Sequence, residues 1–169
     1  MHLIIDGYNL LHVSRSPIRR DASELQRERD RLIDQLSAYR KLRPCEITAV
    51  FDGWQGGWTT EQRERKKGIE LIFSRLGEKA DDVIKRLIGV TGSGVVVITS
   101  DREVSRFAER AGAAAIPSDQ FQERIERSVL SFGKEAGERD EEERGERRKG
   151  SARKPSKKER KAREALKKL

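Results

Sequence analysis

The sequence predicts an α/β fold in which helices cover both faces of a central parallel sheet of about five strands. Short apolar segments alternate with longer segments whose apolar residues recur at helical spacing, and this alternation is typical of β-strand–helix–β-strand units. The short segments are almost continuously apolar, which indicates strands that are buried on both faces. Three of the segments end in an aspartate, so one edge of the predicted sheet is a candidate site.

Five segments are expected to form the strands. The segment 95–99, Val-Val-Val-Ile-Thr, has the strongest β propensity and is predicted to lie at the centre of the sheet. The first strand ends at Asp6, where Gly7 lets the backbone turn sharply. The full set of expected strands is 3–6, 46–52, 69–73, 95–99 and 113–116.

Four segments between the strands are expected to form helices. Asp21 and Glu24 have the spacing of a capping box, and the helix that they begin should end before Pro44. Ser100 and Glu103 have the same spacing and predict the start of another helix. The expected helices are 21–43, 78–89, 100–112 and one that begins at 117–119.

Charge is distributed unevenly along the chain. Charged residues make up 39% of the 169 residues, against about 25% in ordinary domains. Residues 147–169 contain twelve Lys and Arg and two Glu, a net charge of +10, so the whole-chain value of +8 leaves residues 1–146 at −2. We therefore expect a packed domain over 1–134 and a highly charged basic tail over 135–169, flexible or helical when bound.

The basic tail predicts binding to RNA or another polyanion, because neutralised phosphates supply much of the affinity in such complexes. The ribosome is a candidate partner for a tail of this kind. The tail residues expected to bind RNA are Arg147, Arg148, Lys149, Arg153, Lys154, Lys157 and Lys158.

A second candidate RNA-binding segment lies at 54–68, where two tryptophans and four cations follow one another. Aromatic rings can stack on unpaired bases while cations bind the phosphates. Glycines flank the tryptophans, which favours a mobile flap over the alternative, a loop whose tryptophans pack on the sheet edge. The residues concerned are Trp54, Trp58, Arg63, Arg65, Lys66 and Lys67.

The single cysteine, Cys45, excludes an internal disulfide and a cysteine metal cluster. The N-terminus lacks the features of a signal peptide, and no apolar run approaches the roughly 18 residues of a membrane span. A soluble cytoplasmic protein with no membrane or disulfide partner is therefore expected.

Four aspartates are the candidate catalytic residues. Asp6, Asp52 and Asp101 each end an expected strand, and Asn9 adds an amide near the first of them. Asp81 lies on the rim of a helix's apolar face, which favours it over Asp82 as a site residue. The alternatives are ordinary capping roles, because Asp often stabilises turns and helix N-termini.

Carboxylates brought together in this way need a cation to offset their repulsion. An all-oxygen set without a Cys or His cluster favours one or two Mg²⁺ or Mn²⁺ ions over zinc. Such ions generate a hydroxide nucleophile and neutralise charge on a phosphate, so the residues predict metal-assisted phosphodiester hydrolysis.

Four motifs in this order resemble the NYN branch of the PIN-like nucleases, and most closely the bacterial YacP-type proteins, over about residues 2–132. The resemblance implies a PIN-like three-layer fold with strand order 3-2-1-4-5 and a divalent-metal-dependent endoribonuclease activity. The motifs are Ile5-Asp6-Gly7-Tyr8-Asn9-Leu10, Val50-Phe51-Asp52-Gly53, Ala80-Asp81-Asp82-Val83-Ile84 and Ile98-Thr99-Ser100-Asp101.

The resemblance also implies roles for individual residues. Asp6, Asp81 and Asp101 would be metal ligands, and Asn9 and Asp52 would bind the metal or support its ligands. Ser100 would orient a ligand or phosphate. Whether Asp82 or Asp119 joins the site stays open. The charged tail lies outside the resemblance and is interpreted from its charge alone.

The sequence thus predicts an endoribonuclease that acts on mRNA or ribosome-associated RNA. The main alternative is a non-catalytic RNA-binding or ribosome-associated module on the same fold. A phosphotransfer enzyme with Asp6 as nucleophile is less favoured, because Tyr8 stands where such enzymes have a second aspartate.

Overall fold

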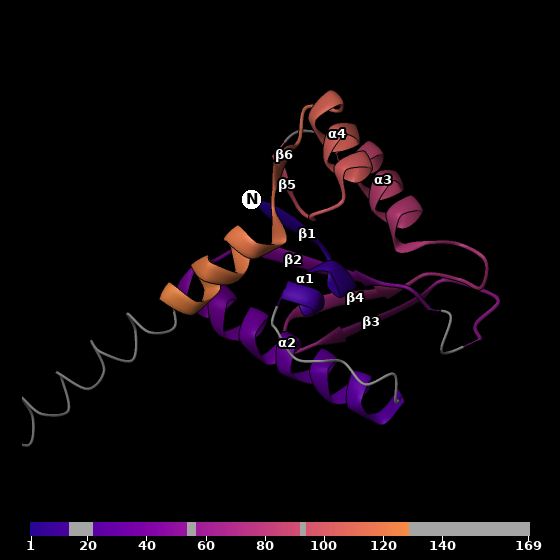
Figure 1. The fold of residues 1–169 in the computed structure, drawn as a ribbon, viewed down its shortest axis with the longest axis horizontal. Coiled ribbons are helices and arrows are strands. Elements are labelled where there is room, and N and C mark those ends of the chain that lie inside the picture. The colour runs from indigo at the N-terminus through magenta and orange to yellow at the C-terminus, as the bar shows by residue number, and fades with distance from the viewer. Residues whose placement is uncertain (14–21, 54–56, 92–93, 129–169) are drawn as a thin grey trace, which may run out of the picture. The chain divides into compact units, whose positions relative to one another are not determined.

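The strands in the described part of the chain form one six-stranded sheet (Figure 1). A computed structural model describes residues 1–13, 22–53, 57–91 and 94–128, which all belong to one compact unit; the expected tail 135–169 lies outside them. The strands are β1 (His2–Asp6), β2 (Glu46–Phe51), β3 (Gln62–Lys66), β4 (Ile69–Phe73), β5 (Val95–Ile98) and β6 (Ala114–Ile116). Their order across the sheet is β3-β4-β2-β1-β5-β6.

Five of the strands are parallel, and they are the five that the sequence predicts. Omitting β3, they lie in the order 3-2-1-4-5 that the family resemblance implies. β1 lies at the centre, with Ile5 opposite Ala49 of β2 on one side and Ile98 of β5 on the other. The carboxyl ends of β1, β2 and β5 therefore meet at one edge of the sheet.

The sixth strand corrects the prediction that 54–68 is a loop. β3 pairs antiparallel with β4 at the edge of the sheet, and the two join in a tight hairpin. Lys67 and Gly68 both have positive φ, 53° and 82°, as a two-residue hairpin turn requires. β3 has no apolar residue, because an edge strand needs only the backbone hydrogen bonds of one neighbour and charged side chains protect it from further pairing.

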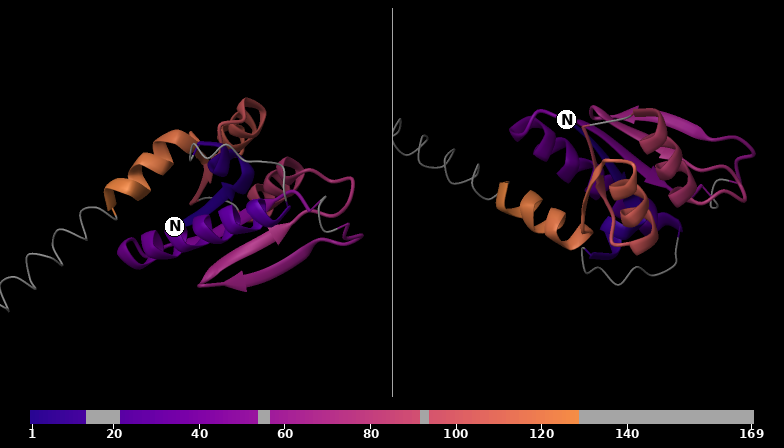
Figure 2. Two further views of the ribbon diagram at one scale, coloured as in Figure 1. Left: turned by 60° about the horizontal axis from the view of Figure 1, so that its bottom comes forward. Right: turned by 90° about the horizontal axis from the view of Figure 1, so that it is seen from above.

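Helices cover both faces of the sheet (Figures 1 and 2). One face packs against α1 (Gly7–Val13), α2 (Ala22–Leu42) and a helix over residues 118–128. The other face packs against α3 (Ala80–Thr91) and α4 (Arg102–Arg110). Alternate residues of β1 divide between the two cores, with Ile5 in the first and Ile4 in the second. None of the helices described is long and apolar enough to cross a membrane.

The short helix α1 is a second departure from the prediction, which placed no helix directly after the first strand. Its first residue, Gly7, has no unusual φ but lacks space for a side chain: a Cβ there would lie 2.2 Å from the ring of Phe51. The glycine therefore serves a close approach of α1 to β2, whereas the sequence assigned it to a sharp turn.

The start of α4 corrects one predicted capping box. Asp101, and not Ser100, is the N-cap, because its carboxylate accepts hydrogen bonds from the backbone N–H groups of Glu103 and Val104. Asp52 has a similar role at α3, where its Oδ1 accepts from the N–H of Ala80 at 2.7 Å. α3 consequently begins at Ala80, two residues later than predicted.

Candidate active site

Asp6 is the most buried of the candidate carboxylates, with 4% of its surface exposed. It lies at the end of the central strand, and the first turn of α1 brings Asn9 back over it. Asn9 donates to Asp6 twice, from its backbone N–H to Oδ1 at 3.1 Å and from its side-chain amide to Oδ2 at 2.6 Å. These contacts give Asn9 a direct means of orienting the Asp6 carboxylate.

Thr99 is a third partner of Asp6 that sequence reasoning missed. Its buried hydroxyl donates to Asp6 Oδ2 at 3.3 Å and accepts from the backbone N–H of Asp101 at 3.1 Å. Thr99 therefore connects the ends of β1 and β5. The signal that could have found it is a hydroxyl residue at a strand end, two positions before a candidate aspartate.

Burial raises the pKa of Asp6 above its ordinary value. The hydrogen bonds from Asn9 and Thr99 oppose this effect, and the negative charge of Asp52 adds to it. The chain thus holds a carboxylate in a position where its charged form is poorly solvated, and a bound cation would offset that cost.

Asp81 reaches the same region from the first turn of α3. Burial raises its pKa, and so do the charges of Asp6 and Asp101, while Lys85 lowers it. Asp82, in the same turn, is exposed. Asp81 is therefore half-buried and is repelled by the carboxylates at the sheet edge. This agrees with the prediction from its rim position that Asp81 faces the sheet.

The four aspartates come from four separate segments of the chain and influence one another electrostatically. Asp52 raises the pKa values of both Asp6 and Asp81. Asp52 and Asp101 also stabilise helix N-termini, and each uses its Oδ1 atom for that purpose. Asp52 and Asp101 thus cap helices and also interact with the other aspartates. From the sequence alone, capping and a role in the site are alternatives.

The acidic residues form a loose group. Within the described part of the chain, no three Asp, Glu, His or Cys side chains lie close enough together to hold a metal ion by themselves. The donor set still fits Mg²⁺ or Mn²⁺, since Mg²⁺ is commonly held by one or two carboxylates, with water and substrate phosphates as the other ligands. The repulsion that raises the Asp6 and Asp81 pKa values favours a cation in the same place.

The electrostatics predict how Asp81 affects stability. A carboxyl whose pKa rises on folding stabilises the protein at low pH, and this contribution is lost as the pH rises through the folded-state pKa. We expect metal-free Asp81→Asn to unfold about 2–4 °C above the wild type at pH 7.5, with no such gain at pH 4. Thermal unfolding in EDTA at the two pH values measures this. A variant less stable than wild type at pH 7.5 would show that the favourable interaction of Asp81 with the N-terminus of α3 outweighs its repulsion by the other carboxylates.

Ser100 and Asp119 lie next to the start of the helix over 118–128. Ser100 Oγ accepts from the backbone N–H of Ser118 at 3.3 Å, and Asp119 Oδ1 accepts from the N–H of Gln120 at 2.9 Å. The first contact connects the turn after β5 to this helix, and the second is local. Asp119 is exposed, and it is not among the main causes of the raised pKa of Asp6 or of Asp81.

Three of the four cations in the 54–68 segment form ion pairs within the folded domain, whereas a mobile flap would leave them available for RNA. Arg63 pairs with Glu61 and Glu70, Lys66 with Asp30, and Lys67 with Asp34. The last two pairs connect the β3–β4 hairpin to α2, and within this segment residues 62–66 belong to the sheet. Arg65 is exposed on β3, and Trp54 lies outside the described residues.

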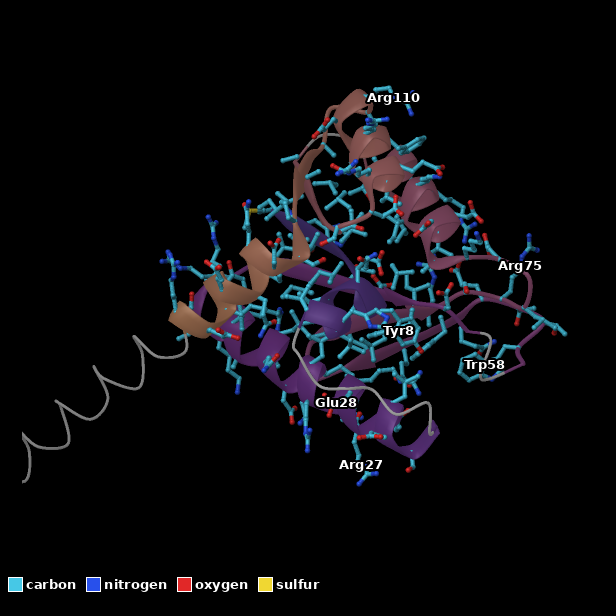
Figure 3. The ribbon with its side chains drawn as sticks, in the orientation of Figure 1. Tyr8, Arg27, Glu28, Trp58, Arg75 and Arg110 are labelled. Atoms are coloured by element: carbon cyan, nitrogen blue, oxygen red, sulfur yellow. The ribbon has the colours of Figure 1, made fainter. Side chains whose placement is uncertain are left out.

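Trp58 is 38% exposed and packs edge-on against Phe73, with ring centroids 5.4 Å apart. Phe73 stacks on Phe51 at 5.7 Å, and Phe51 meets Tyr8 edge-on at 5.4 Å. We call these four rings the aromatic row. It runs from Tyr8, two residues after Asp6, to a partly exposed tryptophan. Figure 3 shows Tyr8 and Trp58 at the end of the sheet to which β1 and β2 run.

A cavity of about 430 Å³ lies at the other end of the sheet, and none of the four candidate aspartates lines it. It is lined by residues at the starts of β1, β2 and β4, including His2, Thr48 and Glu70. Thr48 donates to Glu70 at 3.0 Å, and His2 contacts Thr48 at 2.8 Å. These groups satisfy one another, so the cavity is not the candidate active site.

The comparisons with known proteins agree with this fold. The family model described as a YacP-like NYN domain matches residues 3–168, so the similarity runs on through the charged segment and the prediction that it stops near residue 132 is wrong. No curated protein sequence gives a match.

Two solved structures are similar. The crystal structure of a tryptophan-to-leucine mutant of Rae1 (YacP) from Bacillus subtilis has a TM-score of 0.68 at 22% identity over 83% of this chain and 84% of that one. Another crystal structure of Rae1 (YacP) from the same organism has a TM-score of 0.65 at 21% identity over 99% and 91%.

Proposed function

Because this chain belongs to the YacP-like NYN domain family, a family with a nuclease-like fold, we propose that it is a divalent-metal-dependent endoribonuclease. The observation that supports the proposal is the mutual electrostatic influence of Asp6, Asp52, Asp81 and Asp101 near the carboxyl edge of the sheet. Burial and mutual repulsion raise the pKa values of Asp6 and Asp81 there, which is typical of a functional site.

Each residue of the site would have a distinct role in the reaction. Asp6, Asp81 and Asp101 would hold one or two Mg²⁺ or Mn²⁺ ions, which supply an activated water and neutralise charge on the phosphate. Asn9 and Thr99 keep the Asp6 oxygens in place through their hydrogen bonds. Asp52 holds the start of α3, and through it the position of Asp81.

Cleavage of a mixed single-stranded and structured RNA by the full chain tests the proposal. Cutting is expected with Mg²⁺ or Mn²⁺ and is expected to stop in EDTA. Asp34→Asn is the control, because this exposed aspartate of α2 pairs with Lys67 and lies outside the carboxylate group. RNA binding without cutting under any metal would favour the non-catalytic binding module. Cutting that appears only on translating ribosomes would identify the ribosome as a required partner.

The basic tail is proposed to supply most of the RNA affinity. Removing residues 147–169 takes away twelve cations and leaves the remainder of the chain at −2. We expect the log–log salt dependence of RNA binding to flatten by about 0.7 for every phosphate that the tail no longer neutralises, with at least about tenfold weaker binding at moderate salt. The binding constant measured at several salt concentrations checks this. An unchanged slope would assign the affinity to the folded domain.

A further inference from the structure

Arg29 on α2 differs from the cations around it. Among the described residues its guanidinium has no carboxylate within ion-pair distance, although the side chain is half-buried. One of its terminal amines donates to Gln26 Oε1 at 2.6 Å, and its buried Nε has no partner in the described part of the chain. Neighbouring cations are neutralised by Asp30, Asp34 and Glu28.

The position of Arg29 is fixed by the aromatic row. Its guanidinium carbon lies 5.5 Å from the centre of the Phe73 ring, a cation–π contact. Phe73 stacks on Phe51 at 5.7 Å and Phe51 meets Tyr8 at 5.4 Å, so two further ring contacts connect Arg29 to the turn that follows Asp6. Arg29 therefore lies at the aromatic row, whose first ring, Tyr8, follows Asp6 by two residues in the chain.

A half-buried cation without a carboxylate is unfavourable in the free protein, so a ligand anion is its expected partner. The guanidinium fork matches the oxygens of a phosphate. Other cations at the same sheet edge already have carboxylate partners: Lys85 pairs with Glu103, Arg86 with Glu61 and Glu78, and Arg75 with Glu78.

We propose that Arg29 binds a backbone phosphate of the RNA next to the scissile bond and so positions the strand over the carboxylates. The inference rests on the proposed function and names a substrate contact within it. Arg29 is a binding residue, and its contact with Phe73 holds it in place before the RNA arrives.

The test compares Arg29→Met with Arg27→Met in the full chain. Methionine keeps an apolar side chain over Phe73 and removes the charge. Arg27 is an exposed cation of the same helix (Figure 3), and its guanidinium donates hydrogen bonds to the backbone carbonyl and the hydroxyl of Ser23. Two quantities are measured on a single-stranded RNA oligonucleotide: kcat/KM with Mg²⁺, and the salt dependence of binding in EDTA.

Arg29→Met is expected to lower kcat/KM about 30-fold and to flatten the log–log salt slope by about 0.7, the value for one phosphate contact. Arg27→Met should stay within about twofold and keep the wild-type slope. A folded Arg29→Met protein with the wild-type slope overturns the proposal, whatever its cleavage rate. If wild-type protein binds RNA but never cuts it, the proposed nuclease activity fails, and the slope still decides whether Arg29 holds a phosphate.

Arg29→Lys keeps the inference testable if the methionine variant does not fold. Lysine keeps the positive charge but does not have the planar fork. The salt slope should therefore stay at the wild-type value while kcat/KM falls about tenfold. Wild-type kcat/KM in this variant would show that the guanidinium geometry has no role and would overturn the proposal.

Discussion

Asp6→Asn is expected to reduce RNA cleavage about 1,000-fold. The change keeps the size of the side chain and removes the negative charge that would attract the metal ion. Charge stabilisation by a catalytic metal is worth several kcal/mol, and about 1.4 kcal/mol corresponds to each tenfold in rate. Because Asp6 is buried and receives hydrogen bonds from Asn9 and Thr99, no neighbouring side chain can take its place without disturbing that network.

The measurement is kcat/KM on a defined RNA at saturating Mg²⁺, with RNA binding measured in EDTA beside it. Binding should stay within about threefold of wild type, because the tail cations are unchanged. Asp34→Asn serves again as the control for the removal of one aspartate. A variant that keeps more than a tenth of the wild-type activity would remove Asp6 from the reaction, and the capping of the following turn would then be its only role.

Gly7→Ala is expected to destabilise the protein by about 2–3 kcal/mol and to lower its Tm by roughly 10 °C. The added Cβ would lie 2.2–2.6 Å from three ring atoms of Phe51. Phe51 cannot give way easily, since it is fully buried between the rings of Tyr8 and Phe73. Cleavage should fall as well, because any shift of α1 moves Asn9 away from Asp6.

Gly89→Ala is the matched control for this substitution. Gly89 lies on the exposed side of α3, a Cβ added there would meet no atom within 4 Å, and its φ is not positive. Alanine at this position should stabilise the helix by about 0.5–1 kcal/mol. Thermal unfolding of both variants gives the comparison. Equal Tm values for Gly7→Ala and wild type would show that α1 can move away from β2 at no cost in stability.

Much of the fold could be predicted from the sequence, because five strands and four helices carry strong hydrophobic patterns. β3 and α1 could not. β3 is entirely polar and owes its structure to pairing with β4, and α1 is seven residues long, too short for a clear apolar period. Neither element has a local signal strong enough to compete with the neighbouring loops.

The aspartates of the candidate site could be predicted from the sequence, but the residues that contact them or lie beside them could not. A carboxylate at the end of a buried strand is visible in the chain, and the helical rim position of Asp81 favoured it over Asp82. Thr99 and Arg29 were missed because their importance depends on contacts with Asp6 and Phe73, from segments 93 and 44 residues away in the chain.

The sequence by itself determined the parallel α/β architecture, the four aspartates, and a basic segment after a near-neutral body. These follow from periodicity, strand-end position and charge, which are local properties. Only the tertiary structure decided which oxygens are already engaged in helix caps, which cations are neutralised, and that Arg29 is left beside the aromatic row without a carboxylate among the described residues. Hydrogen bonds and ion pairs act over a few ångströms, so they depend on which distant segments the sheet brings together.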